Sequence, residues 1–126
     1  MIFESHAHYD DEAFDEDRES LLLSFAGHGI DRVINVGASL AGCRATLGLM
    51  EKYPFVYGAM GVHPSETAQL SEEGIAWLQE QCSRDKVVAV GEIGLDYYWK
   101  EPEEAVQKRW FERQLELARE VALPVI

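Results

Sequence analysis

The sequence opens on Met1-Ile2-Phe3-Glu4-Ser5-His6-Ala7-His8, a short apolar stretch that ends in two histidines. We predict that residues 2–5 form a β-strand. Residues i and i+2 of a strand point to the same face, so His6 and His8 are expected to direct two imidazoles at one point just past the strand end. Two neutral imidazoles directed at one point are typical of a metal site.

Downstream of this stretch, predicted strands and helices alternate and are joined by short connections. Each further strand is a short apolar run, and each helix carries apolar side chains three or four residues apart. We expect further strands over residues 32–37, 55–62 and 87–93, a fifth strand opening at 123–126, and helices over 15–26, 40–53, 71–82 and 102–122. This alternation is typical of βαβ units and a parallel sheet.

Two α/β architectures fit four β/α units and the start of a fifth strand. The length of 126 residues suits an open sheet. The candidate residues His6, His8, His63 and Glu92 all fall at the carboxyl ends of predicted strands, where (β/α)8 barrels build their active sites. No Gly-x-Gly-x-x-Gly turn marks a dinucleotide site. A full barrel needs ~250 residues, so we predict that residues 1–126 form a single incomplete domain, the N-terminal half of a barrel.

The amino-acid composition limits the kinds of partner that this chain is expected to bind. The chain has 11 Lys and Arg against 23 Asp and Glu, a net charge of −12. Such an acidic protein repels polyanions unless something local, such as a bound divalent cation, reverses the field. Its two cysteines, Cys43 and Cys82, form no Cys-x-x-Cys motif and are expected to be buried thiols. No stretch approaches the ~20 apolar residues of a membrane span, and we expect a cytoplasmic protein with no membrane partner.

Glu92 is the strongest candidate after the two histidines. It lies in the apolar stretch Val90-Gly91-Glu92-Ile93, where an unpaired carboxylate is costly. A salt bridge to Arg32 or Arg44 would satisfy it. A bound metal is the sharper interpretation, because two histidines point to the same end of the sheet, and the two oxygens of Glu92 are able to span two ions.

Three other residues have both a functional and a structural interpretation. Asp10 either supports a ligand histidine or belongs to a solvated acidic run. His63, before Pro64, either contacts substrate phosphate or a metal-bound water, or is held in a turn by the proline. Asp96 either orients a ligand or caps its loop, and the aromatic residues 97–99 beside it either stack on a base or pack on the rim of the barrel.

Together these residues resemble the TatD-type metal-dependent deoxyribonucleases, a branch of the amidohydrolase-like (β/α)8 barrels. The stretch around Glu92 is the most specific part of the resemblance, and Ser5 and Tyr9 are mild departures from it. The matching segments are Ser5-His6-Ala7-His8-Tyr9-Asp10, Gly61-Val62-His63-Pro64, residues 88–98, Gln107 with Phe111, Gln114-Leu115, Leu117-Ala118 and Leu123-Pro124-Val125-Ile126.

The resemblance implies hydrolysis of DNA phosphodiester bonds at two divalent metal ions, which are Mg²⁺, Mn²⁺ or Zn²⁺. His6 and His8 would hold the first ion and Glu92 would bridge to the second. Glu92 and His63 would take part in catalysis, in which metal-activated water attacks phosphorus. The family's remaining ligands, two histidines and an aspartate, have no counterpart in this sequence. We therefore expect that this chain is truncated, and the sequence leaves open whether it is active on its own.

Two further interpretations compete with the DNase. One is a metal-dependent amidohydrolase that acts on C–N or ester bonds, and the other is a non-catalytic half-barrel that self-associates. The first and fifth strands of a half-barrel would be bare edges beside a half-filled core. We therefore predict a homo-oligomer or association with a missing C-terminal half.

Overall fold

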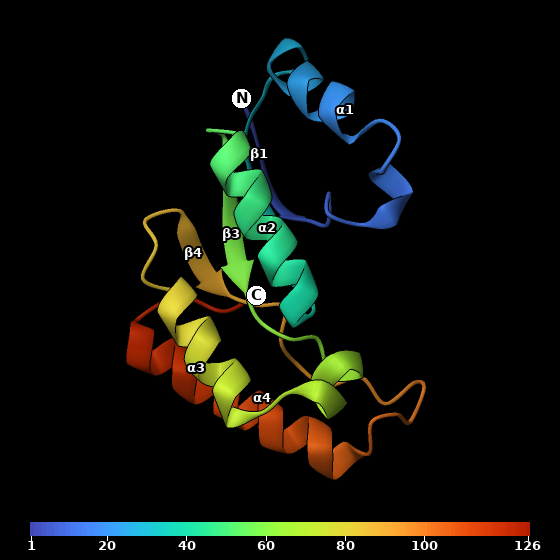
Figure 1. The fold of residues 1–126 in the computed structure, drawn as a ribbon, viewed down its shortest axis with the longest axis vertical. Helices are drawn as coiled ribbons and strands as arrows, with labels where there is room; N and C mark the ends of the chain where they lie inside the picture. The colour runs from blue at the N-terminus through green and yellow to red at the C-terminus, as the bar shows by residue number, and fades with distance from the viewer.

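The computed structural model describes residues 1–126 and consists of one parallel sheet with helices packed against it (Figure 1). The strands lie in the order β1-β2-β3-β4 and are β1 (Ile2–Ala7), β2 (Ile30–Val36), β3 (Val56–Met60) and β4 (Val87–Val90). The α-helices are α1 (Arg18–Ser24), α2 (Leu40–Lys52), α3 (Glu72–Gln81) and α4 (Glu104–Val121), and the 3₁₀ helices are η1 (Glu12–Phe14), η2 (Phe25–His28) and η3 (Pro64–Gln69). The predicted alternation and parallel pairing are confirmed.

Helix starts follow simple capping chemistry. The hydroxyl of Ser71 accepts a hydrogen bond from Gly74 N at the start of α3, as the sequence predicts. Ser39 does the same for Gly42 N at the start of α2. Helix α4 begins at Glu104, two residues later than predicted, because Glu103 before it has an extended backbone.

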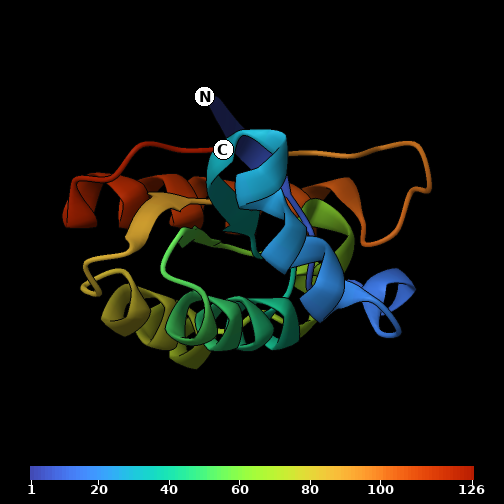
Figure 2. The same ribbon diagram turned by 90° about the horizontal axis from the view of Figure 1, so that it is seen from above.

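The sheet has one covered face and one open face. The larger core cluster fills the space between the sheet and the helices, and Figure 2 shows α2 and α3 on one side of the strands. A smaller cluster of Ile34, Val36, Ala59 and Ala89 lies on the opposite face. There the structure has an apolar hollow of about 500 Å³, lined by Phe3, Arg32, Ile34, Tyr57, Val88, Ala89, Pro124 and Ile126. We call this surface the open sheet face.

The main differences from the prediction lie at strand ends. Strands β3 and β4 end at Met60 and Val90, so the residues that follow them belong to loops. The predicted fifth strand is reduced to a single parallel bridge between Val125 and Val90. Helix α1 ends at Ser24, two residues earlier than predicted, and continues as η2, which ends at Gly29 in the left-handed conformation with φ +74°. No helix is both long and apolar enough to cross a membrane.

Both cysteines are buried free thiols, as predicted. Burial raises the pKa of Cys43 to about 12, and burial raises that of Cys82 to about 11. At pH 8 the reactive thiolate is therefore scarce. Neither thiol is expected to react with an aromatic disulfide reagent within minutes in the native protein, and both are expected to react in denaturant. Rapid modification of one thiol without denaturant would contradict this burial.

Candidate metal centre

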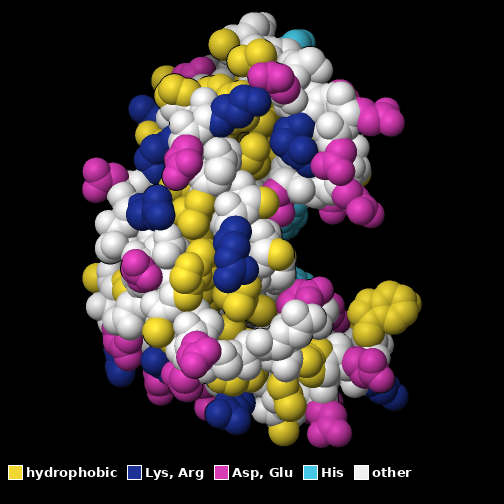
Figure 3. Space-filling model, in the orientation of Figure 1, with side chains coloured by type: hydrophobic (Ala, Val, Ile, Leu, Met, Phe, Trp, Pro, Cys, Tyr) yellow, Lys and Arg dark blue, Asp and Glu magenta, His cyan; other side chains and the backbone are white.

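The carboxyl ends of the strands bring three possible metal ligands together. One ligand atom from each of His6, His8 and Glu92 lies within 4.8 Å of the others. The Nε2 atoms of both histidines are 3.4 Å from the same oxygen of Glu92. Side-chain exposure of about two-fifths for the histidines and 28% for Glu92 leaves the group accessible at the base of a hollow, where histidine atoms are visible in Figure 3.

Glu92 follows β4 at one edge of the sheet, and backbone hydrogen bonds explain how it reaches the histidines of β1 at the other edge. Gly91 N donates to Met60 O (2.9 Å), and Glu92 N then donates to Gly37 O (2.6 Å), which lies just past the end of β2. A Cβ on Gly61 would lie 2.6 Å from the backbone of Gly91. Glycine at this position therefore lets the two chain segments approach, and Glu92 comes to lie beside the histidines.

The surroundings of His8 fix which of its nitrogens is free. Its Nδ1 lies 2.8 Å from the carbonyl oxygen of Val36. A carbonyl only accepts, so Nδ1 carries the proton and donates. The lone pair on Nε2 is then directed at the space beside Glu92, which is the form a metal ligand needs.

His63 is arranged in the opposite way. Its Nδ1 accepts a hydrogen bond from Ser65 N (3.1 Å) at the start of η3 and also contacts Ser65 Oγ (2.7 Å). In the neutral ring the proton then sits on Nε2, which is 3.8 Å from the second oxygen of Glu92. His63 is thus held in a turn, as the structural interpretation expects, and also presents an N–H to the mouth of the site.

Asp10 contacts a buried asparagine rather than a histidine. Its carboxylate accepts from Asn35 Nδ2 (2.9 Å), which also donates to Thr46 Oγ1, while Asn35 Oδ1 accepts from Tyr9 N. Asn35 is fully buried. Burial, with a smaller contribution from the charge of Glu4, raises the pKa of Tyr9. Asp10 anchors the loop after β1, and its predicted support of a ligand histidine stays a prediction.

Asp96 caps its own loop. Its carboxylate accepts from Tyr98 N (3.0 Å), and its backbone N and O both bond to the buried side-chain amide of Gln107. The loop after β4 is therefore fixed to helix α4, and a ligand-orienting role for Asp96 stays a prediction. The expected alternative partners of Glu92 are not used: Arg44 lies over the ring of Trp77, and neither Arg44 nor Arg32 forms a salt bridge with Glu92.

The sequence reasoning did not identify the buried polar side chains that hold these loops. Gln114 accepts from Val62 N (2.8 Å) and donates to Val62 O (3.1 Å), next to His63. Gln107 and Gln114 lie seven residues apart on one face of α4. Asn35 is the third buried polar side chain that holds a loop. Its position in an otherwise apolar strand was the sequence feature that could have indicated it.

Comparison with known proteins identifies the family of this chain. The family model described as TatD related DNase matches residues 3–126. The chain belongs to the TatD-related DNase family. A relative from Bacillus subtilis, the uncharacterized metal-dependent hydrolase YabD, is 37% identical over 126 residues, which are 100% of this chain and 49% of the relative. The 3'-5' ssDNA/RNA exonuclease TatD of Cronobacter turicensis is 33% identical over 89% of this chain and 43% of its own length.

Solved structures of TatD proteins share the fold. The crystal structure of the TatD homologue YjjV from Escherichia coli superposes with a TM-score of 0.88 at 34% identity, over 98% of this chain and 49% of that one. A TatD-family hydrolase from Entamoeba histolytica gives a TM-score of 0.89 at 24% identity and supports the fold alone. The predicted N-terminal half of a (β/α)8 barrel is confirmed, and the chain spans about half the length of the TatD relatives it matches.

Proposed function

We propose that His6, His8 and Glu92 hold a divalent metal ion and that this site serves hydrolysis of nucleic-acid phosphodiester bonds. The observation that carries the proposal is the convergence of three ligand atoms within 4.8 Å at the carboxyl ends of β1 and β4. Kinship with metal-dependent hydrolases and a named exonuclease supports the reaction class. Metal-assisted hydrolysis needs an open cluster of this kind rather than a closed structural site, and DNA is the substrate we propose.

The donor set fits a divalent cation. Two imidazoles and one carboxylate suit Zn²⁺ or Mn²⁺, and Mg²⁺ is consistent with the family resemblance. When bound, such an ion lowers the pKa of water and neutralises charge on phosphate oxygens. One oxygen of Glu92 lies beside the two histidines and the other lies 3.8 Å from Nε2 of His63, which supports the proposal that Glu92 would also hold a second ion.

Residues of this chain orient the two histidine rings and supply one hydrogen-bond donor for the substrate. In the neutral rings, the Val36 carbonyl holds the proton of His8 on Nδ1 and leaves its Nε2 lone pair free, and the Ser65 N–H places the proton of His63 on Nε2. We propose that the Nε2–H of His63 donates to a phosphate oxygen of the substrate. The two unpaired, buried thiols suit a reducing compartment, and we propose a cytoplasmic location.

Hydrolysis is tested with the purified chain and a fluorescently labelled single-stranded DNA. Cleavage is expected with Mg²⁺ or Mn²⁺, to be lost in EDTA, and to be lost in the Glu92→Ala variant. Cleavage that persists in both EDTA and the variant would contradict the proposal. Metal binding without cleavage would support the metal site and would contradict hydrolysis by this chain alone.

The open sheet face supports association of this chain with a second copy or with the other half of a barrel. Phe3 is 59% exposed on the edge strand β1 and lines the hollow of this face with the apolar side chains of β2 and β4. Contiguous exposed apolar surface of this kind marks an interaction site. The two histidines and the aspartate that the resemblance implies would also have to come from such a partner.

Association has a direct test in solution. Light scattering at micromolar concentration is expected to give a mass above that of one chain, and Phe3→Ser is expected to lower it. Leu23→Ser is the matched control, because Leu23 is 65% exposed but lies on α1, away from the open sheet face. A wild-type mass of one chain would refute self-association.

A further inference from the structure

We propose that Tyr98 and Trp99 form a stacking platform for the bases of a single-stranded nucleic acid whose backbone enters the candidate metal centre. The inference rests on the proposed function, since it takes a nucleic acid as substrate, and it adds the place where the bases bind. It concerns the loop of residues 94–100, which follows Glu92 in the chain.

The two rings are free in the structure. Tyr98 is 79% exposed and Trp99 is 72% exposed, so the alternative that they pack on the rim of the barrel does not describe them. Their ring centroids are 4.7 Å apart at an interplanar angle of 85°. In this edge-to-face pair each ring steadies the other while flat ring surface stays open to solvent. Every base has a π-face, so such a surface binds single strands with little regard to sequence.

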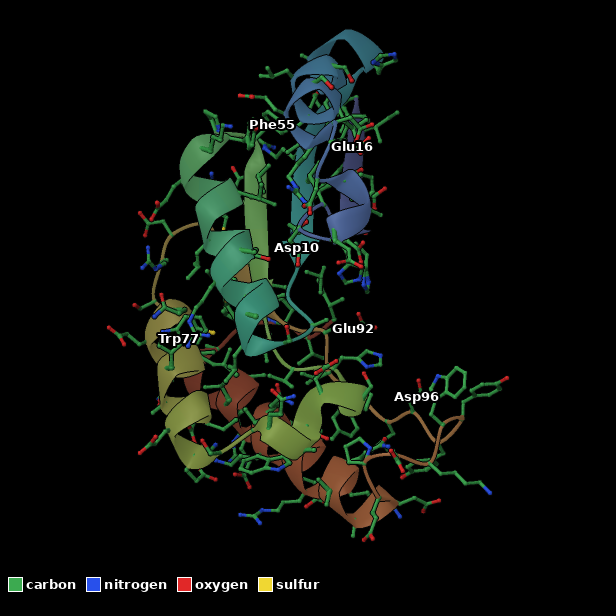
Figure 4. The ribbon with its side chains drawn as sticks, turned by 45° about the vertical axis from the view of Figure 1, so that its right-hand side comes forward. Asp10, Glu16, Phe55, Trp77, Glu92 and Asp96 are labelled. Carbon is green, nitrogen blue, oxygen red and sulfur yellow. The ribbon has the colours of Figure 1, made fainter.

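The loop holds the rings at a fixed place beside the metal centre. The side-chain amide of Gln107 accepts from Asp96 N and donates to Asp96 O, and the Asp96 carboxylate accepts from Tyr98 N. Tyr98 follows Glu92 by six residues, so the Cα atoms of these two residues lie within ~22 Å of each other. Figure 4 shows the loop that carries Asp96 extending outward from the position of Glu92. A platform fixed near the site restrains the strand that is cleaved there.

The charge around the mouth favours this side for a polyanion. On the opposite side of Glu92, the segment after β1 carries six acidic residues within eight positions: Asp10, Asp11, Glu12, Asp15, Glu16 and Asp17. Asp10 and Glu16 of this segment lie across from Asp96 in Figure 4. Residues 94–104 on this side carry the acids Asp96, Glu101, Glu103 and Glu104 and the cation Lys100. Lys108 lies 6.0 Å from the ring of Tyr97 and forms a salt bridge with Glu104. Phosphates are therefore repelled more strongly from the first side than from the second.

Binding of a fluorescein-labelled oligothymidylate of eight nucleotides, measured by anisotropy in EDTA, tests the platform without hydrolysis. Tyr98→Ala and Trp99→Ala are each expected to weaken binding about fivefold or more, since a base–aromatic stack contributes that much. Trp99→Phe retains a ring and is expected to bind within about twofold of wild type. Leu23→Ala, an exposed apolar residue on α1, is the control and is expected to bind as wild type.

The outcomes separate this inference from the proposed function. Wild-type affinity in the Tyr98→Ala/Trp99→Ala double variant, or no binding of the oligonucleotide by the wild-type chain, overturns the platform. The Glu92→Gln variant removes the proposed hydrolysis and is expected to keep oligonucleotide binding in EDTA. Stacking with no hydrolysis in the wild type would therefore overturn the proposed reaction alone, and hydrolysis with no loss of affinity in the double variant would overturn the platform alone.

Discussion

Replacing His8 with alanine is expected to weaken the binding of Zn²⁺ by about 100-fold or more. Loss of a residue that merely orients a ligand costs about 10–100-fold in metal affinity, and removal of the ligand itself should cost at least the upper value. The side chain of His8 is 41% exposed, so the fold is expected to survive its loss. Competition with a chromophoric chelator measures the affinity, and circular dichroism checks the fold.

His28→Ala is the matched control for this experiment. His28 lies at the end of η2, its ring contacts Ser24 O (2.9 Å), and it is not part of the cluster of His6, His8 and Glu92. The control is expected to bind Zn²⁺ as the wild type does. Equal affinity in the His8→Ala and His28→Ala variants would refute the candidate metal centre.

Replacing Gln114 with leucine is expected to lower the free energy of unfolding by about 2–6 kcal/mol, at about 1–3 kcal/mol for each of two buried backbone groups left unsatisfied. Gln114 is 1% exposed, and its amide satisfies both Val62 N and Val62 O. Leucine fills a similar volume but offers neither group a partner. The loss is large against the ~5–15 kcal/mol total of a typical domain, and urea unfolding measures it.

Gln79→Leu is the control for the glutamine substitution. Gln79 lies on α3 and is exposed, so its replacement by leucine is expected to change the free energy of unfolding by less than about 0.5 kcal/mol. Equal effects of the two substitutions would mean that the paired hydrogen bonds of Gln114 contribute nothing measurable.

The architecture was predictable because it follows from patterns within short segments. The apolar runs of β2 and β3 are buried on both faces of the sheet, and Ser71 occupies a capping position whose chemistry is local. β1 ends at Ala7, two residues later than predicted, so His6 lies in the strand and His8 directly follows it. Their i, i+2 spacing still brings them together, and both lie beside Glu92.

The features that escaped prediction depend on contacts between distant segments. Nothing in the residues around Glu92 indicates that its backbone N–H bonds to Gly37 O, just past the end of β2, a strand that is not adjacent to β4. Gln107 and Gln114 belong to the family resemblance, but only the packed structure shows which loop each one fixes. The opposite proton positions of His8 and His63 also arise from partners that the tertiary fold supplies.

The route of Glu92 across the end of β3 has a thermodynamic consequence. Strands β1 and β4 lie at opposite ends of the sheet order, and the candidate ligands come from just these two ends. A cation held there would act as a removable cross-link that exists only in the folded chain. By linkage it would add about 2.7 kcal/mol of stability at a free concentration one hundred times its dissociation constant. The melting temperature of this protein would then report the supply of metal in its surroundings.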